Sequence, residues 1–260
     1  MKKITSIVVI AAIALVFASC NSGSNNSNSS ALSGSAAEKA YVKPGEHDEF
    51  YAFISGGFNG QLSVYGLPSG RLFKVIPVFS QDAEKAYGYN EETKPFLNTS
   101  HGFVPWDDLH HPDISQTNGE LDGRWVFANG NNTPRIARVD LTTFETAEVI
   151  EIPNSAGNHS SSYVTENTEY VVAGTRFAVP FPQQDMPINQ YKSNFKGAIS
   201  FLGVDQESGE MSLDFQIMMP GFDYDKAHPG RGESHGWFFF TTYNTEEGST
   251  LLEVNASQND

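Results

Sequence analysis

The sequence contains a single cysteine, Cys20, among its 260 residues. One thiol excludes an internal disulfide framework and a cysteine-rich zinc site, and its place near the N-terminus excludes a thiol nucleophile buried in the globular part. A transition metal bound further along the chain therefore needs histidine, carboxylate, methionine or backbone oxygen ligands, unless the metal brings its own sulfide.

Basic residues are also scarce. The chain has 16 Lys and Arg against 31 Asp and Glu, so its formal net charge is −15. Such a surface repels phosphate backbones and anionic lipid headgroups. We therefore expect no nucleic-acid partner, and no membrane contact except through a covalently attached lipid.

The sequence also lacks a long apolar run: the N-terminal one, residues 7–17, is too short to span a bilayer stably. Lys2 and Lys3 precede this run and small residues lead to Cys20, as in a bacterial lipoprotein signal. We predict a signal peptide at 1–19, export to the periplasm and a lipid on Cys20; the alternative is an ordinary signal peptide with an accidental cysteine. Residues 20–43 are rich in Ser, Asn and Gly, which predicts a flexible tether.

The rest of the chain, 44–260, repeats one pattern. Two strands joined by a polar turn recur at 61–77, 135–153 and 198–220. An apolar strand precedes each hairpin, at 50–54, 125–127 and 170–173, and a fourth copy begins at 237–241 and continues into 250–254.

This repeat is typical of β-propeller blades. Aromatic residues at 12 % and 23 glycines also favour short strands joined by tight turns over helices. We predict an all-β fold made of about three and a half N-terminal blades, with a β-sandwich as the alternative. Since propeller rings close with roughly four to eight blades, we expect the chain to be the N-terminal part of a longer protein.

Histidines are the candidate chemical groups. His110 and His111 are adjacent, and His159 follows 49 positions after His110. Neighbours in a regular strand point to opposite faces, so the pair can serve one site only from a loop or an irregular strand edge, which Pro112 favours. A separation of about one blade places His159 on the next blade at a comparable height, so the three imidazoles could meet.

Three interpretations of these histidines stay open from the spacing. They are surface-loop residues without a special role, three zinc ligands of a hydrolase, or copper ligands. The four other histidines are predicted to lie in turns: His47, His101, His228 and His235.

Five segments, in order, carry a family resemblance: 50–57, 71–79, 108–115, 123–129 and 243–246. Together they resemble nitrous-oxide reductase, in its secretion-dependent branch, from about Tyr51 to the end of the chain. The resemblance implies a seven-bladed propeller followed by a cupredoxin domain, with a four-copper sulfide cluster held on the propeller axis by seven histidines.

The resemblance also implies which residues act. His110, His111 and His159 would be catalytic copper ligands, and Tyr243, Glu246 and Asp260 would bind calcium. Four further histidines and the cupredoxin domain, with its binuclear copper centre, would lie beyond residue 260. Asp113 is a candidate to hold one imidazole in place.

The implied function is the two-electron reduction of nitrous oxide to dinitrogen and water, a step of denitrification. The electron donor would be a c-type cytochrome or a cupredoxin, and the full-length protein would be a homodimer. We expect this chain alone to be inactive. The alternative function is a lipid-anchored propeller that binds a partner or a glycan without catalysis.

Overall fold

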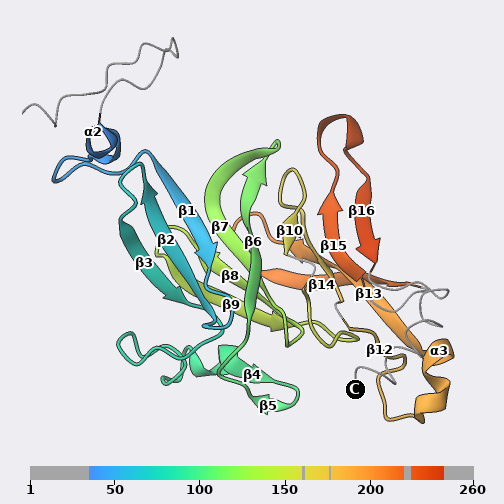
Figure 1. The fold of residues 1–260 in the computed structure, drawn as a ribbon. Helices are drawn as coiled ribbons and strands as arrows, with labels where there is room; N and C mark the ends of the chain where they lie inside the picture. Colours follow the sequence, from blue (N-terminus) through green and yellow to red (C-terminus); the bar gives the residue numbers. More distant parts are fainter. Residues whose placement is uncertain (1–34, 160–161, 176, 220–223, 243–260) are drawn as a thin grey trace, which may run out of the picture. The chain divides into compact units, whose positions relative to one another are not determined.

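The computed structural model describes residues 35–159, 162–175, 177–219 and 224–242 (Figure 1). The chain divides into two units, Met1–Tyr41 and Val42–Asp260. The predicted signal peptide and Cys20 lie outside the described residues. In the described part of the chain, no helix is long and apolar enough to cross a membrane.

The described part of the first unit contains one short helix, α2 (Ala36–Ala40). The Ser35 hydroxyl accepts a hydrogen bond from the Glu38 N–H, and the Glu38 carboxylate accepts one from the Ser35 N–H. This reciprocal cap stabilises a single helical turn within the region predicted to be a tether.

The second unit is built from antiparallel sheets, which confirms the predicted all-β fold. The first is β1 (Phe50–Ser55), β2 (Gln61–Leu67) and β3 (Leu72–Pro77). The second is β6 (Leu109–Thr117), β7 (Glu120–Gly130), β8 (Arg135–Asp140) and β9 (Glu145–Glu151).

The third and fourth sheets follow along the chain. The third contains β10 (Tyr163–Val164), β11 (Tyr170–Gly174), β12 (Val179–Pro180), β13 (Phe195–Val204) and β14 (Met211–Met219). The fourth is β15 (Tyr224–Pro229) with β16 (Phe238–Thr242). The connections hold β4 (Asn98–Thr99), β5 (Gly102–Phe103), α3 (Tyr191–Asn194) and three 3₁₀ turns, η1 (Lys94–Leu97), η2 (Ile188–Gln190) and η3 (Gly232–Ser234).

The three predicted hairpins are confirmed as β2–β3, β8–β9 and β13–β14. The apolar strands predicted before them are β1, the middle of β7, and β11, and the fourth copy begins at β16. The second half of that copy, 250–254, lies outside the described residues. Strand β6 was missed, because His110, His111 and Pro112 interrupt its apolar alternation.

Apolar side chains fill the seam between each pair of successive sheets. Leu62 and Val64 of the first sheet pack with Val126 and Val139 of the second. Further along the chain, Phe127 and Ile136 pack with Val171 and Leu202 of the third. Val172, Ile199 and Phe201 pack with Phe238 and Phe240 of the fourth. Successive sheets that pack face to face through such shared apolar clusters are typical of propeller blades.

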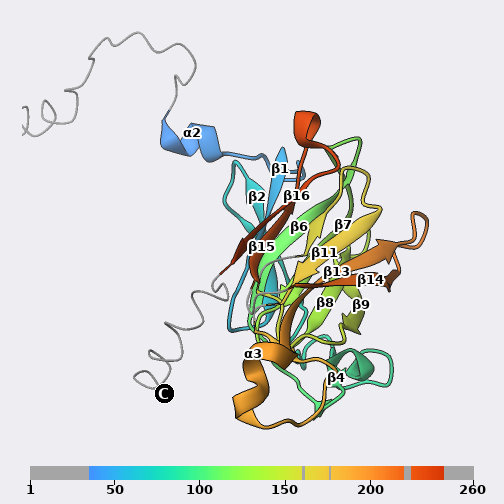
Figure 2. The same ribbon diagram turned by 90° about the vertical axis from the view of Figure 1, so that its right-hand side faces the viewer.

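The first strands of successive sheets are neighbours. Strand β6 contacts β1 on one side and β10 on the other, and β10 contacts β15 (Figure 1). Figure 2 shows β1, β6 and β15 in the view turned by 90°. The first two sheets are also joined by a backbone bridge between Gly57 and Leu109. The segment just after β1 therefore lies beside the start of β6.

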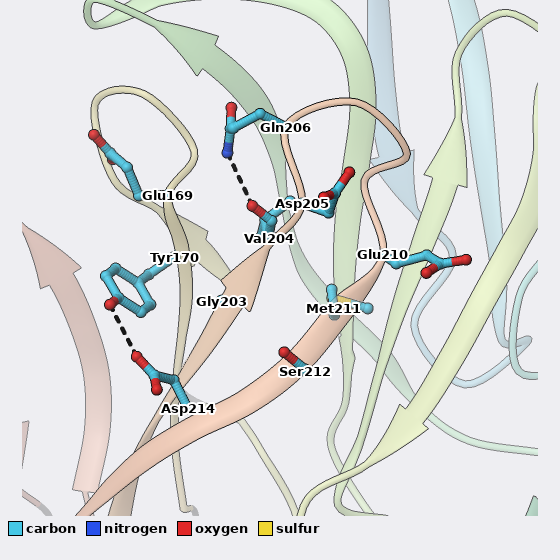
Figure 3. Close-up of a pocket in the computed structure, with 10 residues that line it drawn as sticks. All are labelled: Glu169, Tyr170, Gly203, Val204, Asp205, Gln206, Glu210, Met211, Ser212 and Asp214. Atoms are coloured by element: carbon cyan, nitrogen blue, oxygen red, sulfur yellow. Dashed lines mark hydrogen bonds between the residues drawn. The ribbon is translucent and has the colours of Figure 1, made fainter.

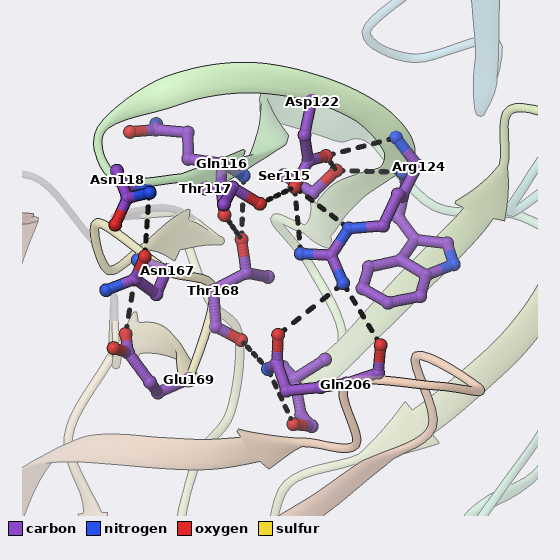
Figure 4. Close-up of polar contacts among 12 residues, drawn as sticks. Ser115, Gln116, Thr117, Asn118, Asp122, Arg124, Asn167, Thr168, Glu169 and Gln206 are labelled. Atoms are coloured by element: carbon purple, nitrogen blue, oxygen red, sulfur yellow. Dashed lines mark hydrogen bonds and ion pairs between the residues drawn. The ribbon is translucent and has the colours of Figure 1, made fainter.

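Polar contacts at the β6–β7 hairpin join the second and third sheets (Figure 4). Asp122 accepts hydrogen bonds from the hydroxyls of Ser115 and Thr117 and from Arg124 Nε. The Arg124 guanidinium in turn donates to the Gln206 carbonyl over 3.1 Å. This network fixes the hairpin of the second sheet against the β13–β14 turn of the third.

A fully buried arginine holds the connection between the first and second sheets. Arg135 donates hydrogen bonds of 3.1 Å to the carbonyls of Val104 and Trp106, and its guanidinium lies 5.0 Å from the centre of the Phe79 ring. Its Nη2 atom is 3.5 Å from the Asp107 carboxylate. These contacts fix the backbone that leads into β6.

Candidate metal centre

Three imidazole rings meet where β6 begins and in the turn that precedes β10. The ring centroids of His110 and His111 are 5.5 Å apart, those of His110 and His159 are 5.1 Å apart, and those of His111 and His159 are 5.2 Å apart. His110 and His111 belong to β6, whereas His159 lies in the turn before β10. The predicted convergence of the three rings is thus observed, and their role as ligands stays a prediction.

A bulge explains how adjacent histidines reach one place. Along β6 two residues, His111 and Pro112, separate His110 from Asp113, while one residue separates their partners on β7. His111 takes the left-handed backbone conformation, with φ +37°. The extra residue breaks the strand's alternation, so neighbouring side chains no longer point to opposite faces.

The His159 turn is held against the end of β7. The Asn158 N–H donates to the Gly130 carbonyl over 3.0 Å, and the Asn129 amide donates to the Asn158 carbonyl. The Ser155 hydroxyl contacts Asn158 Oδ1 at 2.9 Å. Because Asn129 is the register partner of His110, these contacts bring His159 beside the histidine pair.

A buried carboxylate stands behind His110. Oδ1 of Asp108 lies 3.1 Å from Nδ1 of His110, and the side chain of Asp108 is 2 % exposed. A carboxylate behind a metal-binding imidazole orients the ring and makes the opposite nitrogen a better donor. Asp108 was not predicted from the sequence, although residues two apart in an extended segment share a side.

Asp113, which the sequence suggested for this role, accepts hydrogen bonds from backbone N–H groups instead. Its Oδ1 accepts a 3.0 Å hydrogen bond from the Ile114 N–H, and its Oδ2 accepts one of 3.0 Å from the Val164 N–H. Burial raises the pKa of the Asp113 carboxyl, against the opposing effect of these two N–H groups. Asp113 therefore ties β6 to β10.

The remaining predicted residues lie elsewhere. His47 and His101 are exposed, and His101 lies in a turn as predicted. The prediction of a turn at His228 is wrong, because this residue pairs with Phe239 within β15, and its ring is 4.6 Å from that of Tyr163. His235 Nδ1 lies 2.9 Å from a carboxylate oxygen of Glu166. The predicted calcium ligands Tyr243, Glu246 and Asp260 lie outside the described residues.

The donor set suits a late transition metal. Imidazole nitrogens are good ligands for copper and zinc, and a carboxylate behind one ring is the support such ligands usually have. Among the described residues, no three His, Cys, Asp or Glu side chains are already arranged as a group that could hold a metal ion. The fit therefore rests on the type and proximity of the donors.

A cavity of about 500 Å³ lies between β11 and the β13–β14 hairpin (Figure 3). Four carboxylates line it, and three of these already accept hydrogen bonds: Asp205 from Ser208, Glu169 from Thr165, and Asp214 from Tyr170. The pKa of Tyr170 is raised, mainly by its hydrogen bond to the Asp214 carboxylate. These contacts account for Asp205, Glu169 and Asp214 as structural parts of the two turns and the sheet.

No family model matches the chain. Among curated proteins, the nitrous-oxide reductase of Pseudomonas fluorescens is 33 % identical over 220 residues, covering 83 % of this chain and 33 % of the relative. That of Stutzerimonas stutzeri is 32 % identical over 217 residues, covering 82 % of this chain and 32 % of the relative. The chain thus spans about a third of the length of these relatives.

The chain is similar over part of its length to two solved structures of low sequence identity. The β-propeller domain of Myceliophteria thermophila Cps50 (Swd1) has a TM-score of 0.47 at 11 % identity and covers 75 % of this chain and 51 % of that one. U3-55K has a TM-score of 0.39 at 12 % identity and covers 72 % of this chain and 46 % of that one.

Proposed function

The chain is homologous to the nitrous-oxide reductases over more than four-fifths of its length, and from that relationship we propose that it supplies three ligands of a copper–sulfide cluster that reduces nitrous oxide. The observation that carries the proposal is the meeting of the His110, His111 and His159 rings at 5.1–5.5 Å. These are the residues for which the family resemblance implies copper ligation.

The proposed reaction is N₂O + 2H⁺ + 2e⁻ → N₂ + H₂O. Nitrous oxide is a poor ligand and reacts slowly, so both electrons must be available at one place. A bound multicopper cluster would supply electron storage and more than one metal to bind the linear molecule. Neutral imidazoles hold metal without adding negative charge, which favours the reduced state.

This chain's own residues prepare the site. The left-handed conformation of His111 directs two adjacent rings to one region, and the Asn129–Asn158 contact holds the third ring beside them. The His110 side chain is 29 % exposed, so the site is partly shielded from water. Asp108 and Asn131, both buried, form the polar support behind it.

The localisation, the calcium site and the partners of the protein belong to the same proposal. The signal sequence supports export to the periplasm with a lipid on Cys20. Calcium on Tyr243, Glu246 and Asp260, an electron-transfer partner of the cytochrome c or cupredoxin class, and a homodimer follow from the relationship to the reductases.

Copper retention tests the proposal. The chain is loaded anaerobically with Cu(I) and sulfide, desalted, and analysed for copper, zinc and sulfide. We expect the wild type to retain copper and the triple variant His110→Ala/His111→Ala/His159→Ala to lose nearly all of it. The matched control His47→Ala/His101→Ala/His235→Ala removes three exposed histidines and should behave as wild type.

Equal copper in the two triple variants would overturn the proposal and leave the non-catalytic scaffold. Retention of zinc in preference to copper would point to the hydrolase instead. Nitrous oxide consumption with a reduced viologen dye, followed by gas chromatography, measures whether bound copper is sufficient for turnover.

A further inference from the structure

We propose that Asp108 is a positioning residue that keeps the proton of neutral His110 on Nδ1, so that Nε2 presents its lone pair to the metal. The inference deepens the proposed function and rests on it for the identity of the metal. The protonation of His110 can be measured without any metal, so the two can fail separately.

Burial makes the Asp108 carboxylate dependent on its neighbours. The residue is 1 % exposed. Its Oδ2 accepts a 2.9 Å hydrogen bond from the Asn131 amide, and its backbone carbonyl accepts one of 2.9 Å from the Asn131 N–H. Asn131 thus holds the carboxylate in one orientation.

The other oxygen faces the imidazole. Within the described residues, Oδ1 of Asp108 has no hydrogen-bond partner, and Nδ1 of His110 lies 3.1 Å from it. The same nitrogen is farther, at 3.5 Å, from the backbone carbonyl oxygen of Asp108, which already accepts the Asn131 N–H. A desolvated carboxylate oxygen without a donor is costly, and an acceptor nitrogen at that position would repel it. A proton on Nδ1 removes both penalties, and in a neutral ring the lone pair is then on Nε2.

Two neighbouring carboxylates show that this arrangement is specific to Asp108. Asp107 accepts hydrogen bonds from Thr133 and the Asn132 N–H, and its charge faces Arg135. Asp113 accepts two backbone N–H groups. Of these three carboxylates around the histidine pair, Asp108 is the one set against an imidazole nitrogen.

The test is a ¹⁵N NMR measurement of the histidine tautomers in the metal-free chain, at a pH where the rings are neutral. We expect the Nδ1–H form at His110 in the wild type. In Asp108→Asn the amide group can donate to Nδ1, so the Nε2–H form should predominate. Cu(I) affinity, measured by competition with a chromophoric chelator, should fall about 10- to 100-fold.

Asp113→Asn is the matched control, since it neutralises a buried carboxylate of the same strand that faces backbone N–H groups. It should leave the His110 tautomer unchanged. Circular dichroism establishes whether each variant folds. If Asp108→Asn does not fold, the His110 tautomer in the ¹⁵N spectrum of the wild type is the test of the inference.

An Nε2–H tautomer at His110 in the wild type, or an unchanged tautomer in a folded Asp108→Asn, would overturn the inference. The Nδ1–H form together with no copper retention would instead overturn the proposed function and leave the Asp108–His110 assignment in place.

Discussion

His110 in strand β6 and His159 in the turn before β10 are 49 positions apart, yet their ring centroids lie 5.1 Å apart. The β6–β7 pairing and the turn that precedes β10 produce this proximity, since Asn129 is the register partner of His110 and also donates to the Asn158 carbonyl. The candidate centre is therefore assembled by the packing of two neighbouring blades, and its ligands depend on the seam between them.

Arg135 should be essential for the stability of this end of the molecule. Arg135→Met leaves the buried Asp107 carboxylate without its cation, which costs about 3–5 kcal/mol of unfolding free energy. Lys43→Met is the control, because the Lys43–Glu46 pair is exposed and its loss costs at most about 1 kcal/mol. Urea denaturation measures both. Similar costs for the two variants would contradict the assignment of Arg135 as an anchor.

The hairpins were predictable from the sequence because each combines alternating apolar residues with a polar turn, as at 61–77. Strand β6 was not, since His110, His111, Pro112 and Asp113 occupy positions where alternation would show. Strands β10 and β12 have two residues each, too few for any periodic signal.

The meeting of the histidines was predictable, but the residue behind them was not. The spacing of His110 and His159 matches one blade, and Pro112 indicates an irregular strand. Asp108 and Asp113 are both close to the pair in sequence, and only the register of β6 decides which carboxylate faces a ring. Register depends on the bulge, which is a tertiary feature.

Gly209, in the β13–β14 turn, should not tolerate a side chain. It has φ +77°, and a Cβ atom there would lie 2.5 Å from Trp125. Gly70 has φ +69° but would place Cβ in open space. Both alanine variants incur backbone strain of about 1–2 kcal/mol, and Gly209→Ala should cost roughly 1–3 kcal/mol more through overpacking. Equal losses of stability in urea would contradict the close contact with Trp125.

Asp122 should contribute to acid sensitivity. Partial burial alone would raise the pKa of this carboxyl, but hydrogen bonds from Arg124, Ser115 and Thr117 outweigh it and lower the pKa from 3.8 to about 2. Because the folded pKa is depressed, the stabilisation is complete above pH 3.8 and is lost as the pH falls towards 2.

Asp122→Asn should therefore lower stability at pH 6 by about 1–2 kcal/mol and lose less at pH 2.5, so that its pH dependence is flatter than that of the wild type. Asp185→Asn, which changes an exposed carboxylate, is the control and should keep the wild-type slope. Urea titrations at a series of pH values measure both. An unchanged slope in Asp122→Asn would show that a different carboxylate determines the pH dependence of stability in this range.

The bulge at Pro112 should be required for His111 to point to the same region as His110. Deleting Pro112 leaves one residue between His110 and Asp113, which matches the single residue between their partners Asn129 and Phe127 on β7. A regular strand would then direct His111 to the face opposite His110. The deletion should reduce copper retention as much as His111→Ala does, while the chain still folds. Pro112→Ala keeps the residue count of the bulge and should retain copper, so copper loss in Pro112→Ala, or full retention in the deletion, would show that the bulge does not orient the ligands.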